Sequence, residues 1–391
     1  MKKILIVNNN MKVGGVQKSL YNLLWSIDLE HEYNVTLLLF SKEGPYVHDL
    51  PPQVKVVECA GPFAYLGISQ GQCKNAKERL FRGFLAGASR VLGRKSTLKM
   101  LSAFQKKEKE HYDCAIAYLH NGRKRSFYGG VQDYVLSCVD ADKKIAFLHC
   151  DYPNCGADHR ANNRMLARFD RIAACSDGCA RAFKEALPAL GGRCVTVNNC
   201  HRYELIREMA ENDPVSYEQG PLHLLMVARL SREKGIERAI CALDYAKKQG
   251  LEIRLHLVGG GALLGQLQAL SEQMGLSGQV VFHNEQENPY RYMKNADLLL
   301  LSSYHEAAPM VIDEARCLGL PVLTTNTTSA KDMVSDRACG WVCPNSKEGL
   351  ALALCRIARD KEGLARMKRS LACARVGNGE ALSRFADLLA D

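Results

Sequence analysis

Two glutamates, Glu306 and Glu314, flank a predicted helix start in the second half of the chain. An apolar run that is typical of a buried strand ends shortly before them. Pro309 suits the first turn of a helix, because its missing N–H would be unpaired there in any case. We therefore expect a helix from Pro309 to Leu318 that ends at Gly319, with Glu306 in the loop before it and Glu314 more than a turn inside it.

The start of this helix is predicted to bind phosphate. Free backbone N–H groups and the positive end of the helix dipole attract anions at a helix N-terminus. The spacing of Glu306 and Glu314 distributes the two carboxylates along one bound ligand instead of placing them side by side. The candidate phosphate-binding backbone comprises Ala307, Ala308, Pro309 and Met310.

Two cations, Arg229 and Lys234, follow another predicted strand at 222–228 and precede the next helix. An arginine forks onto phosphate oxygens, and a lysine adds a compact positive charge. Two such cations at one diphosphate would stabilise a nucleotide leaving group without a metal ion. We therefore expect a metal-independent site that uses no separate cofactor.

Further candidates also lie just after predicted strands. Gly14 and Gly15 separate a strand from a helix, although the third glycine of a GxGxxG motif is missing. Gly259 opens a run of three glycines, which forms a turn and also lets a ligand approach the backbone closely. His149 stands at the end of the strand at 145–148, where it is either a structural histidine or, as we favour, part of the site.

The elements that must position these residues are short apolar strands separated by helical stretches. Strands that are apolar throughout and alternate with helices predict parallel sheets covered on both faces, an α/β fold. Ligands bind beyond the carboxyl ends of such strands, where the candidate residues stand. The predicted strands are 4–7, 35–40, 54–57, 114–118, 145–148, 172–175 and 194–197, then 222–228, 253–258, 280–283, 298–301, 321–325 and 341–342.

A chain of 391 residues exceeds the size at which one hydrophobic core keeps growing, so two domains are expected. The strand–helix rhythm restarts after a polar stretch at 208–221 that contains Asn212-Asp213-Pro214. We predict a first domain at 1–207, a linker at 208–221 and a second domain at 222–391, whose last helix either stays there or packs back on the first domain.

The order and spacing of these motifs resemble a retaining glycosyltransferase of family 4 with the GT-B fold. The resemblance extends into the first half of the chain through the glycine pair, His149 and a Cys175-Ser176 helix start. Its strongest part covers about 100 residues: Ala228-Arg229-Leu230, Lys234-Gly235, Val258-Gly259-Gly260-Gly261, Glu306 with seven residues before Glu314, and Gly319-Leu320-Pro321-Val322.

The resemblance implies two Rossmann-like, doubly wound domains that face each other across a cleft. It implies that Arg229 and Lys234 contact the donor diphosphate, that Glu314 accepts from the ribose hydroxyls and that Glu306 lies near the donor sugar. It also implies that His149 contacts the transferred sugar. The backbone of the Gly14-Gly15 loop would approach donor phosphate or acceptor.

The implied function is retaining transfer of a sugar from a nucleotide-diphosphate donor, a UDP-sugar by the habit of the family. The acceptor would be a glycan, lipid-linked or other hydroxyl in cell-surface polysaccharide or glycolipid synthesis, held mainly by the first domain. Two alternatives stay open: a nucleotide-sugar epimerase on the same double-Rossmann architecture, and a non-catalytic partner subunit that resembles a glycosyltransferase. His120 with Asn121, Arg123, Lys124 and Arg125 either lines the acceptor site or belongs to ordinary surface.

Basic residues are concentrated in the segment 74–110, which has eleven Lys and Arg and three acids in a chain of net charge +10. Leu80, Phe84, Leu85 and Val91 recur there at helical spacing. Either this helix packs its apolar side on the first domain with a solvated basic face, or it rests on anionic lipid, which we favour. Few aromatic residues interleave with these charges, so no nucleic-acid partner is expected.

The N-terminal apolar run reaches Asn8-Asn9-Asn10 too early for a signal peptide, and no apolar run approaches the roughly 18 residues of a membrane span. We therefore expect a cytoplasmic protein that is either free or peripheral on the inner face of the plasma membrane. The sixteen cysteines contain no CxxC pair and are expected to be free thiols, mostly within the core.

Overall fold

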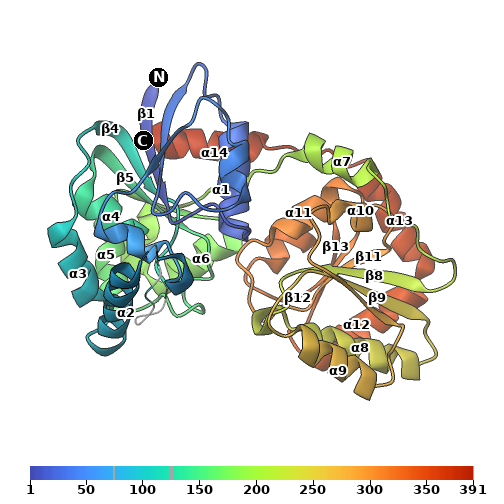
Figure 1. Ribbon diagram of the computed structural model, residues 1–391. Helices are drawn as coiled ribbons and strands as arrows, with labels where there is room; N and C mark the ends of the chain where they lie inside the picture. Colours follow the sequence, from blue (N-terminus) through green and yellow to red (C-terminus); the bar gives the residue numbers. More distant parts are fainter. Residues whose placement is uncertain (74, 123–126, 128, 391) are drawn as a thin grey trace. The chain divides into compact units, whose positions relative to one another are not determined.

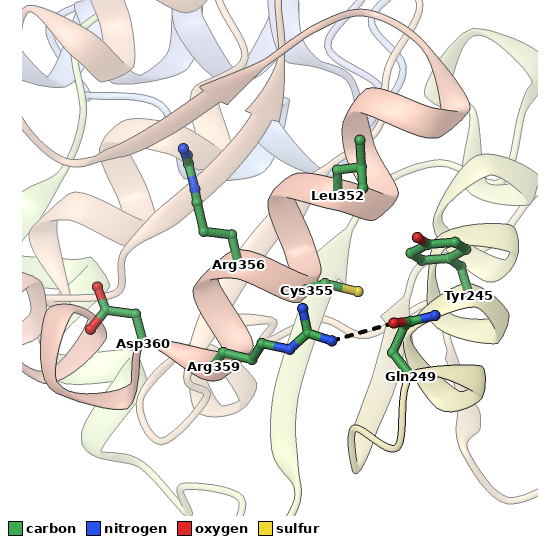
Figure 2. Close-up of a pocket in the computed structure, with 7 residues that line it drawn as sticks. All are labelled: Tyr245, Gln249, Leu352, Cys355, Arg356, Arg359 and Asp360. Carbon is green, nitrogen blue, oxygen red and sulfur yellow. Dashed lines mark hydrogen bonds between the residues drawn. The ribbon is translucent and has the colours of Figure 1, made fainter.

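The computed structural model describes residues 1–73, 75–122, 127 and 129–390, and the chain forms two compact units (Figure 1). One unit consists of residues 1–200 and 378–391, and the other of residues 201–377. Each unit contains one parallel sheet with helices packed against it. The predicted α/β class with two doubly wound domains is therefore confirmed.

The sheet of the first unit has seven parallel strands in the order β3-β2-β1-β4-β5-β6-β7. Every residue from Ile4 to Val7 is fully buried, which shows that both faces of β1 are covered. The fifth strand starts at Asp140, before its predicted run at 145–148. Asp140 and Asp142 are exposed, so the start of the strand lacks the apolar pattern on which the prediction was based. The strands are β1 (Lys2–Asn8), β2 (Tyr33–Leu39), β3 (Lys55–Glu58), β4 (His111–Ala117), β5 (Asp140–Leu148), β6 (Arg171–Ala174) and β7 (Cys194–Thr196).

The sheet of the second unit has six parallel strands in the order β10-β9-β8-β11-β12-β13. Leu224 and Met226 pack in the core on one face of β8, and Leu225 packs in the core on the other face. All the predicted strands occur in the structure. Continuous apolar runs predicted them because strands in a sheet that is covered on both faces are apolar throughout. The strands are β8 (Leu222–Val227), β9 (Ile253–Val258), β10 (Val280–Asn284), β11 (Leu298–Leu301), β12 (Val322–Thr325) and β13 (Gly340–Cys343).

Fourteen α-helices among the described residues connect and cover these strands. In the first unit they are α1 (Gly15–Ser26), α2 (Ala76–Val91), α3 (Arg94–Phe104), α4 (Val131–Cys138), α5 (Arg160–Leu166), α6 (Asp177–Ala186) and α14 (Gly379–Ala390). In the second unit they are α7 (Tyr203–Glu211), α8 (Ile236–Lys248), α9 (Leu264–Gln273), α10 (Tyr290–Met293), α11 (Met310–Cys317), α12 (Lys347–Arg359) and α13 (Lys361–Ala372).

The division between the units falls between residues 200 and 201, earlier than the linker predicted at 208–221. The reason is α7, which buries Tyr203, Ile206 and Ala210 in the core of the second unit. A polar sequence such as that after Glu208 does not reveal that the apolar side of the preceding helix already belongs to the next domain.

Helix α14 belongs to the first unit, although the predicted boundaries place it in the 222–391 domain. It therefore packs back on the first domain, which is one of the two positions considered above for the last helix. It buries Phe385 and Leu388 in the core beneath β1 and β2. The Phe385 ring meets Tyr33 edge-on at 6.3 Å, and the Lys143 ammonium donates to the Leu388 carbonyl at 3.0 Å. The first unit is therefore completed by a segment that follows the whole second unit.

The sixteen cysteines are all free thiols, and twelve of them are buried, which confirms the prediction of core thiols. None of the described helices is long and apolar enough to cross a membrane.

Three histidines form a hydrogen-bonded row across β8, β9 and β10. His223 Nδ1 lies 3.0 Å from His256 Nε2, and His256 Nδ1 lies 3.1 Å from His283 Nε2. His223 Nε2 faces the carbonyl oxygen of Glu218 at 2.8 Å and must donate to it, so each ring in the row is assigned a proton on Nε2. Burial, followed by the charges of His283, His223 and Arg254, lowers the pKa of His256 to about 4.

We expect this row to make the second unit less stable as the pH falls from about 6.5 towards 4. In the unfolded chain His256 takes up a proton near its ordinary pKa of about 6.5, whereas the folded ring stays neutral until about pH 4. The unfolded state therefore gains a proton in this window, which amounts to about 1–2 kcal/mol once solvent screening is discounted.

Urea unfolding at a series of pH values would measure this effect. Trp341 fluorescence in a Trp25→Phe background reports on the second unit alone, because the chain has two tryptophans and only Trp341 lies in that unit. His256→Gln should flatten the pH profile between about pH 6.5 and 4. A profile as steep as that of the parent chain would contradict the assignment.

Candidate functional site

The candidate site lies where the strand order of the second sheet reverses. Strands β8 and β11 are neighbours, but the chain leaves β8 towards β9 on one side and leaves β11 towards β12 on the other. In open parallel sheets, the carboxyl ends of two such strands border a crevice that binds ligands. The loops at 228–235 and 302–309, which contain half of the predicted site residues, both begin at this edge.

Lys234 and Glu306 meet at this edge although they are 72 positions apart. Lys234 Nζ lies 2.7 Å from Glu306 Oε1, and the Ser303 hydroxyl donates to the same oxygen at 2.6 Å. The pair is largely buried, with 24% of the lysine side chain and 10% of the glutamate side chain exposed. Gly235 follows at a left-handed φ of +57°, where an added Cβ would lie 2.3 Å from the Ser302 carbonyl oxygen.

A small pocket of about 20 Å³, which is room for about one water molecule, lies beside the Lys234–Glu306 pair and the start of α11. Its lining includes Lys234, Ser303, Glu306, Pro309 and Val311. Pro309 has an extended backbone, with φ −67° and ψ 113°, so it precedes the helix instead of forming its first turn as predicted. The extended proline lets the loop with Ala307 and Ala308 end at the pocket while α11 starts at Met310.

Arg229 is not brought together with this pair. Its guanidinium binds Glu233 at 2.9 Å, and 72% of its side chain is exposed. Arg229 is also not among the residues that line the pocket. Of the two predicted cations, the structure therefore places Lys234 at the pocket and Arg229 away from it. Arg229 would have to leave Glu233 to contact a ligand in this pocket.

Glu314 lies inside α11 and is only 3% exposed. The residue before it, Asp313, was missed by sequence reasoning although it organises the buried side of this helix. Asp313 contacts Arg337, Arg316 at 3.4 Å and His201 at 3.6 Å. Arg316 is three positions away, but His201 and Arg337 lie 112 and 24 positions away along the chain, so no local pattern could have revealed these two partners.

The charge of Asp313 is stabilised by these partners. Burial alone would raise the pKa of its carboxyl, but the neighbouring His201, Arg337 and Arg316 outweigh it. The pKa therefore lies well below its usual range. A buried carboxylate held by two arginines fixes the orientation of α11, and with it the position of the pocket.

Ser303 was also missed, although a signal was available. It is the second residue after β11 and therefore stands at the ligand edge, like the residues that were selected. Its hydroxyl orients Glu306, and its own carbonyl accepts a hydrogen bond from the Thr325 hydroxyl at 2.6 Å. Ser303 thus links the glutamate to the end of β12.

The glycine run after β9 packs against the loop after β8. Gly259 has φ +145°, and a Cβ there would lie 2.0 Å from the Ala228 carbonyl oxygen. Gly261 has φ +157° and approaches Leu230 in the same way, while the Leu230 N–H donates to the Gly260 carbonyl at 2.8 Å. Gly259 therefore has a structural reason to be glycine before any ligand is considered.

Replacing Gly259 by alanine is accordingly expected to destabilise the second unit by about 3 kcal/mol or more. Gly260→Ala is the matched control, because its Cβ would meet only the Glu285 side chain at 3.4 Å and its φ is not left-handed. Urea unfolding followed through Trp341 would compare the two variants. Equal stabilities would contradict the close approach to Ala228.

In the first unit, the strand order reverses between β1 and β4. Gly14 caps α1 with an extended φ of 175° and therefore needs no left-handed conformation. A Cβ at Gly15 would meet no described atom within 4 Å. A Cβ at Gly14, by contrast, would lie 2.6 Å from the Gln17 side-chain oxygen.

His149 directly follows β5 at the same edge of the first sheet. Its ring stacks on Phe147 at 5.7 Å and lies 4.7 Å from the ring of Tyr118. Burial, then the nearby charge of His120, lowers the pKa of His149 to about 3. The ring is therefore neutral at physiological pH, and its buried Nε2 has no hydrogen-bond partner among the described residues.

The other predicted acceptor residues fall into two groups. Asn121 is buried and shapes its own loop, since it donates to Asp133 at 2.9 Å and accepts from the Gly130 N–H at 3.1 Å. His120 is half-buried and lies near His149. The charges at Arg123, Lys124 and Arg125 lie outside the described residues.

An Asp-x-Asp pair, Asp140 and Asp142, stands at the amino end of β5. Both carboxylates contact His111, at 3.1 and 3.2 Å, on the edge of the sheet opposite His149. Within the described part of the chain, no three or more His, Cys, Asp and Glu side chains are grouped to hold a metal ion.

Comparison with known proteins connects this geometry to a fold class. HepE from Anabaena, solved with UDP and glucose, superposes with a TM-score of 0.67 over the whole of both chains at 19% identity. The structure of WaaG, a glycosyltransferase involved in lipopolysaccharide biosynthesis, superposes with a TM-score of 0.63 over 99% of both chains at 18% identity. The fold is therefore that of the GT-B glycosyltransferases, as the sequence motifs predicted.

Sequence comparison adds a likeness within the second unit. Residues 210–371 match the family model described as glycosyl transferases group 1. The Salmonella typhimurium lipopolysaccharide 1,6-galactosyltransferase is 27% identical over 51% of this chain and 56% of its own length. The Erwinia amylovora amylovoran biosynthesis glycosyltransferase AmsK is 31% identical over 36% of each chain. The matched stretch thus spans between about a third and just over half of these relatives.

Proposed function

We propose that the chain transfers a sugar from a UDP-sugar to a hydroxyl of a glycan or lipid-linked acceptor, in the synthesis of cell-surface polysaccharide or lipopolysaccharide. The observation that carries this proposal is the Lys234–Glu306 pair at the carboxyl edge of the second sheet, beside the start of α11. The names of the relatives, and the UDP bound to HepE, support the acceptor class and the donor nucleotide.

Each group has a role in this proposal. Lys234 binds the donor diphosphate together with the backbone at Ala307–Met310. Glu306, which then no longer accepts from Lys234, accepts hydrogen bonds from the sugar hydroxyls instead. Glu314 holds the ribose. His149 serves as a neutral hydrogen-bonding group towards the sugar, because its depressed pKa excludes a positive charge near neutrality.

The chemical step is proposed to retain the configuration of the sugar. The bond from the anomeric carbon to the phosphate oxygen breaks, the acceptor oxygen bonds to the same face, and the hydroxyl proton passes to the leaving phosphate. Lys234 stabilises the charge that develops on this phosphate, so the proposal needs no metal ion and no separate cofactor. We place this reaction on the cytoplasmic side of the cell.

Thermal unfolding with a panel of nucleotides tests donor binding. A ligand at about a hundred times its Kd stabilises the folded state by about 2.7 kcal/mol, so a UDP-sugar should raise the unfolding temperature. UDP should stabilise far more than UMP, because Lys234 and the start of α11 contact the second phosphate. The absence of a shift with every nucleoside diphosphate would overturn the proposal.

Turnover with the stabilising donor tests the reaction itself. We expect a sugar–acceptor conjugate of retained anomeric configuration, formed at the same rate in EDTA. Loss of activity in EDTA that magnesium restores would refute metal independence. Donor consumption that yields a free epimer without conjugate would instead identify an epimerase.

A further inference from the structure

Helix α2 exposes its apolar side chains and buries polar ones. Leu80, Phe84 and Val91 are 76%, 64% and 80% exposed, whereas Arg82 and Ser89 are buried. Of the large apolar residues in the predicted stripe within α2, only Leu85 is buried. The less favoured of the two alternatives, in which the apolar side of this helix packs on the first domain with a solvated basic face, therefore does not describe the structure.

The contacts of Arg82 explain this rotation of the helix. Its guanidinium donates to the Ile68 carbonyl at 2.9 Å and to the Gln70 side chain at 2.9 Å, and it lies 5.1 Å from the centre of the Phe127 ring. A buried guanidinium must keep its hydrogen bonds, so it fixes the side of α2 that faces inwards. The positions on the opposite side, including Leu80 and Phe84, are thereby held outwards.

Exposed cations surround these apolar side chains. Glu110 is already bound by Lys3 and Lys55, and Glu108 accepts from the Tyr134 hydroxyl, so two of the three acids of the segment are engaged elsewhere. None of the exposed cations forms an ion pair with the residues that the structure describes. The α2–α3 surface consists of exposed Leu80, Phe81, Phe84, Val91, Leu92 and Phe104 with Lys77, Arg79, Arg90, Lys99, Lys106, Lys107 and Lys109.

We propose that the α2–α3 surface lies on an anionic lipid bilayer. Leu80, Phe84 and Val91 share one side of α2 and would enter the boundary between headgroups and acyl chains, while the lysines and arginines contact lipid phosphates. A second copy of the chain does not fit, because two such surfaces would bring like charges together, with Glu78 as the only acid of α2 and α3. Nucleic acid would leave the exposed apolar side chains unexplained.

The position of the surface connects it to the acceptor. The segment at 67–70 accepts from Arg82 of α2, and the Asn10 side chain, just after β1, donates to the Gly67 carbonyl at 3.3 Å. In Figure 1, α2 lies at the end of the first unit away from the N-terminus of β1, where the parallel strands finish. A bilayer at this surface would bring a lipid-linked acceptor to the carboxyl edge of the first sheet, a point that rests on the proposed function.

Cosedimentation of the full chain with vesicles tests the proposal without any transfer assay. We expect recovery with vesicles of equal parts phosphatidylglycerol and phosphatidylcholine, and little recovery with phosphatidylcholine alone. Replacing Arg79, Arg90 and Lys99 by glutamine should lower the partition coefficient about a hundredfold, and high salt should act similarly. Replacing Leu80, Phe84 and Val91 by glutamine should lower it at least about tenfold.

Control variants are available on the second unit, where Leu352 is 59% exposed and Lys247 is exposed. Leu352→Gln and Lys247→Gln should bind vesicles like the parent chain. Equal recovery with both lipid mixtures, or unchanged binding by both triple variants, would overturn the proposal. So would a dimer in analytical ultracentrifugation that the apolar variant dissociates, because the surface would then join two copies. UDP-dependent stabilisation should be unaltered in all variants, which separates this proposal from donor binding.

Discussion

Replacing Lys234 by alanine is expected to lower the rate of sugar transfer at least about a hundredfold. Lys234 is the cation that lines the pocket, and with 24% of its side chain exposed its charge is screened by solvent less than that of a surface lysine. The measurement is kcat and KM with the UDP-sugar that stabilises the chain, and stabilisation by UDP should be lost in parallel. Near-normal turnover would exclude Lys234 from the diphosphate site.

Two comparisons separate this effect from misfolding and from general surface charge. Lys234→Ala leaves Glu306 largely buried without its cation, so Lys234→Ala combined with Glu306→Gln should recover stability but not activity. Arg229→Ala should cost only about tenfold, because Arg229 is 72% exposed and its charge is screened by solvent and by Glu233. A larger loss in Arg229→Ala would show that this arginine leaves Glu233 to bind the donor.

Replacing Asp313 by asparagine is expected to destabilise the second unit by about 3–5 kcal/mol, since Arg337 and Arg316 would lose the carboxylate that compensates them. Urea unfolding followed through Trp341 measures the change. Glu362→Gln is the control, because that side chain is 92% exposed and should matter little. Equal stabilities of the two variants would mean that the Asp313 cluster carries no net stabilisation.

The depressed pKa of Asp313 gives this cluster a pH dependence with a definite sign. Its stabilisation is present above the ordinary carboxyl pKa of about 3.8 and is lost as the pH falls below it towards the folded value. The histidine row acts at higher pH, between about 6.5 and 4. Acid should therefore destabilise the second unit in two separate stages.

The strands and the ligand edge could be predicted because each depends on local sequence. An apolar run such as Leu298–Leu301 is typical of a strand in a sheet that is covered on both faces, and the loop after such a strand lies at the carboxyl edge. Lys234 and Glu306 were found for this reason. Their side chains meet because β8 and β11 are neighbouring strands in the sheet.

The misses depend on contacts between distant residues. Arg82 rotates α2 through partners in another segment, and its burial reverses the amphipathic pattern that the sequence presents. Asp313 is explained by His201 and Arg337, which lie 112 and 24 positions away along the chain. The division between the units lies earlier than the predicted linker because α7 packs with residues that come much later in the chain. None of these choices has a local signature.

Because Phe385 and Leu388 lie in the core of the first unit, its folding cannot be completed during synthesis until the ribosome has passed the whole of 201–377. The second unit is continuous and can finish first. A nascent first unit would meanwhile leave apolar surface beneath β1 and β2 open, a state that chaperones recognise. Ribosomes stalled before α14 should therefore yield a protease-resistant second unit attached to a protease-sensitive first one.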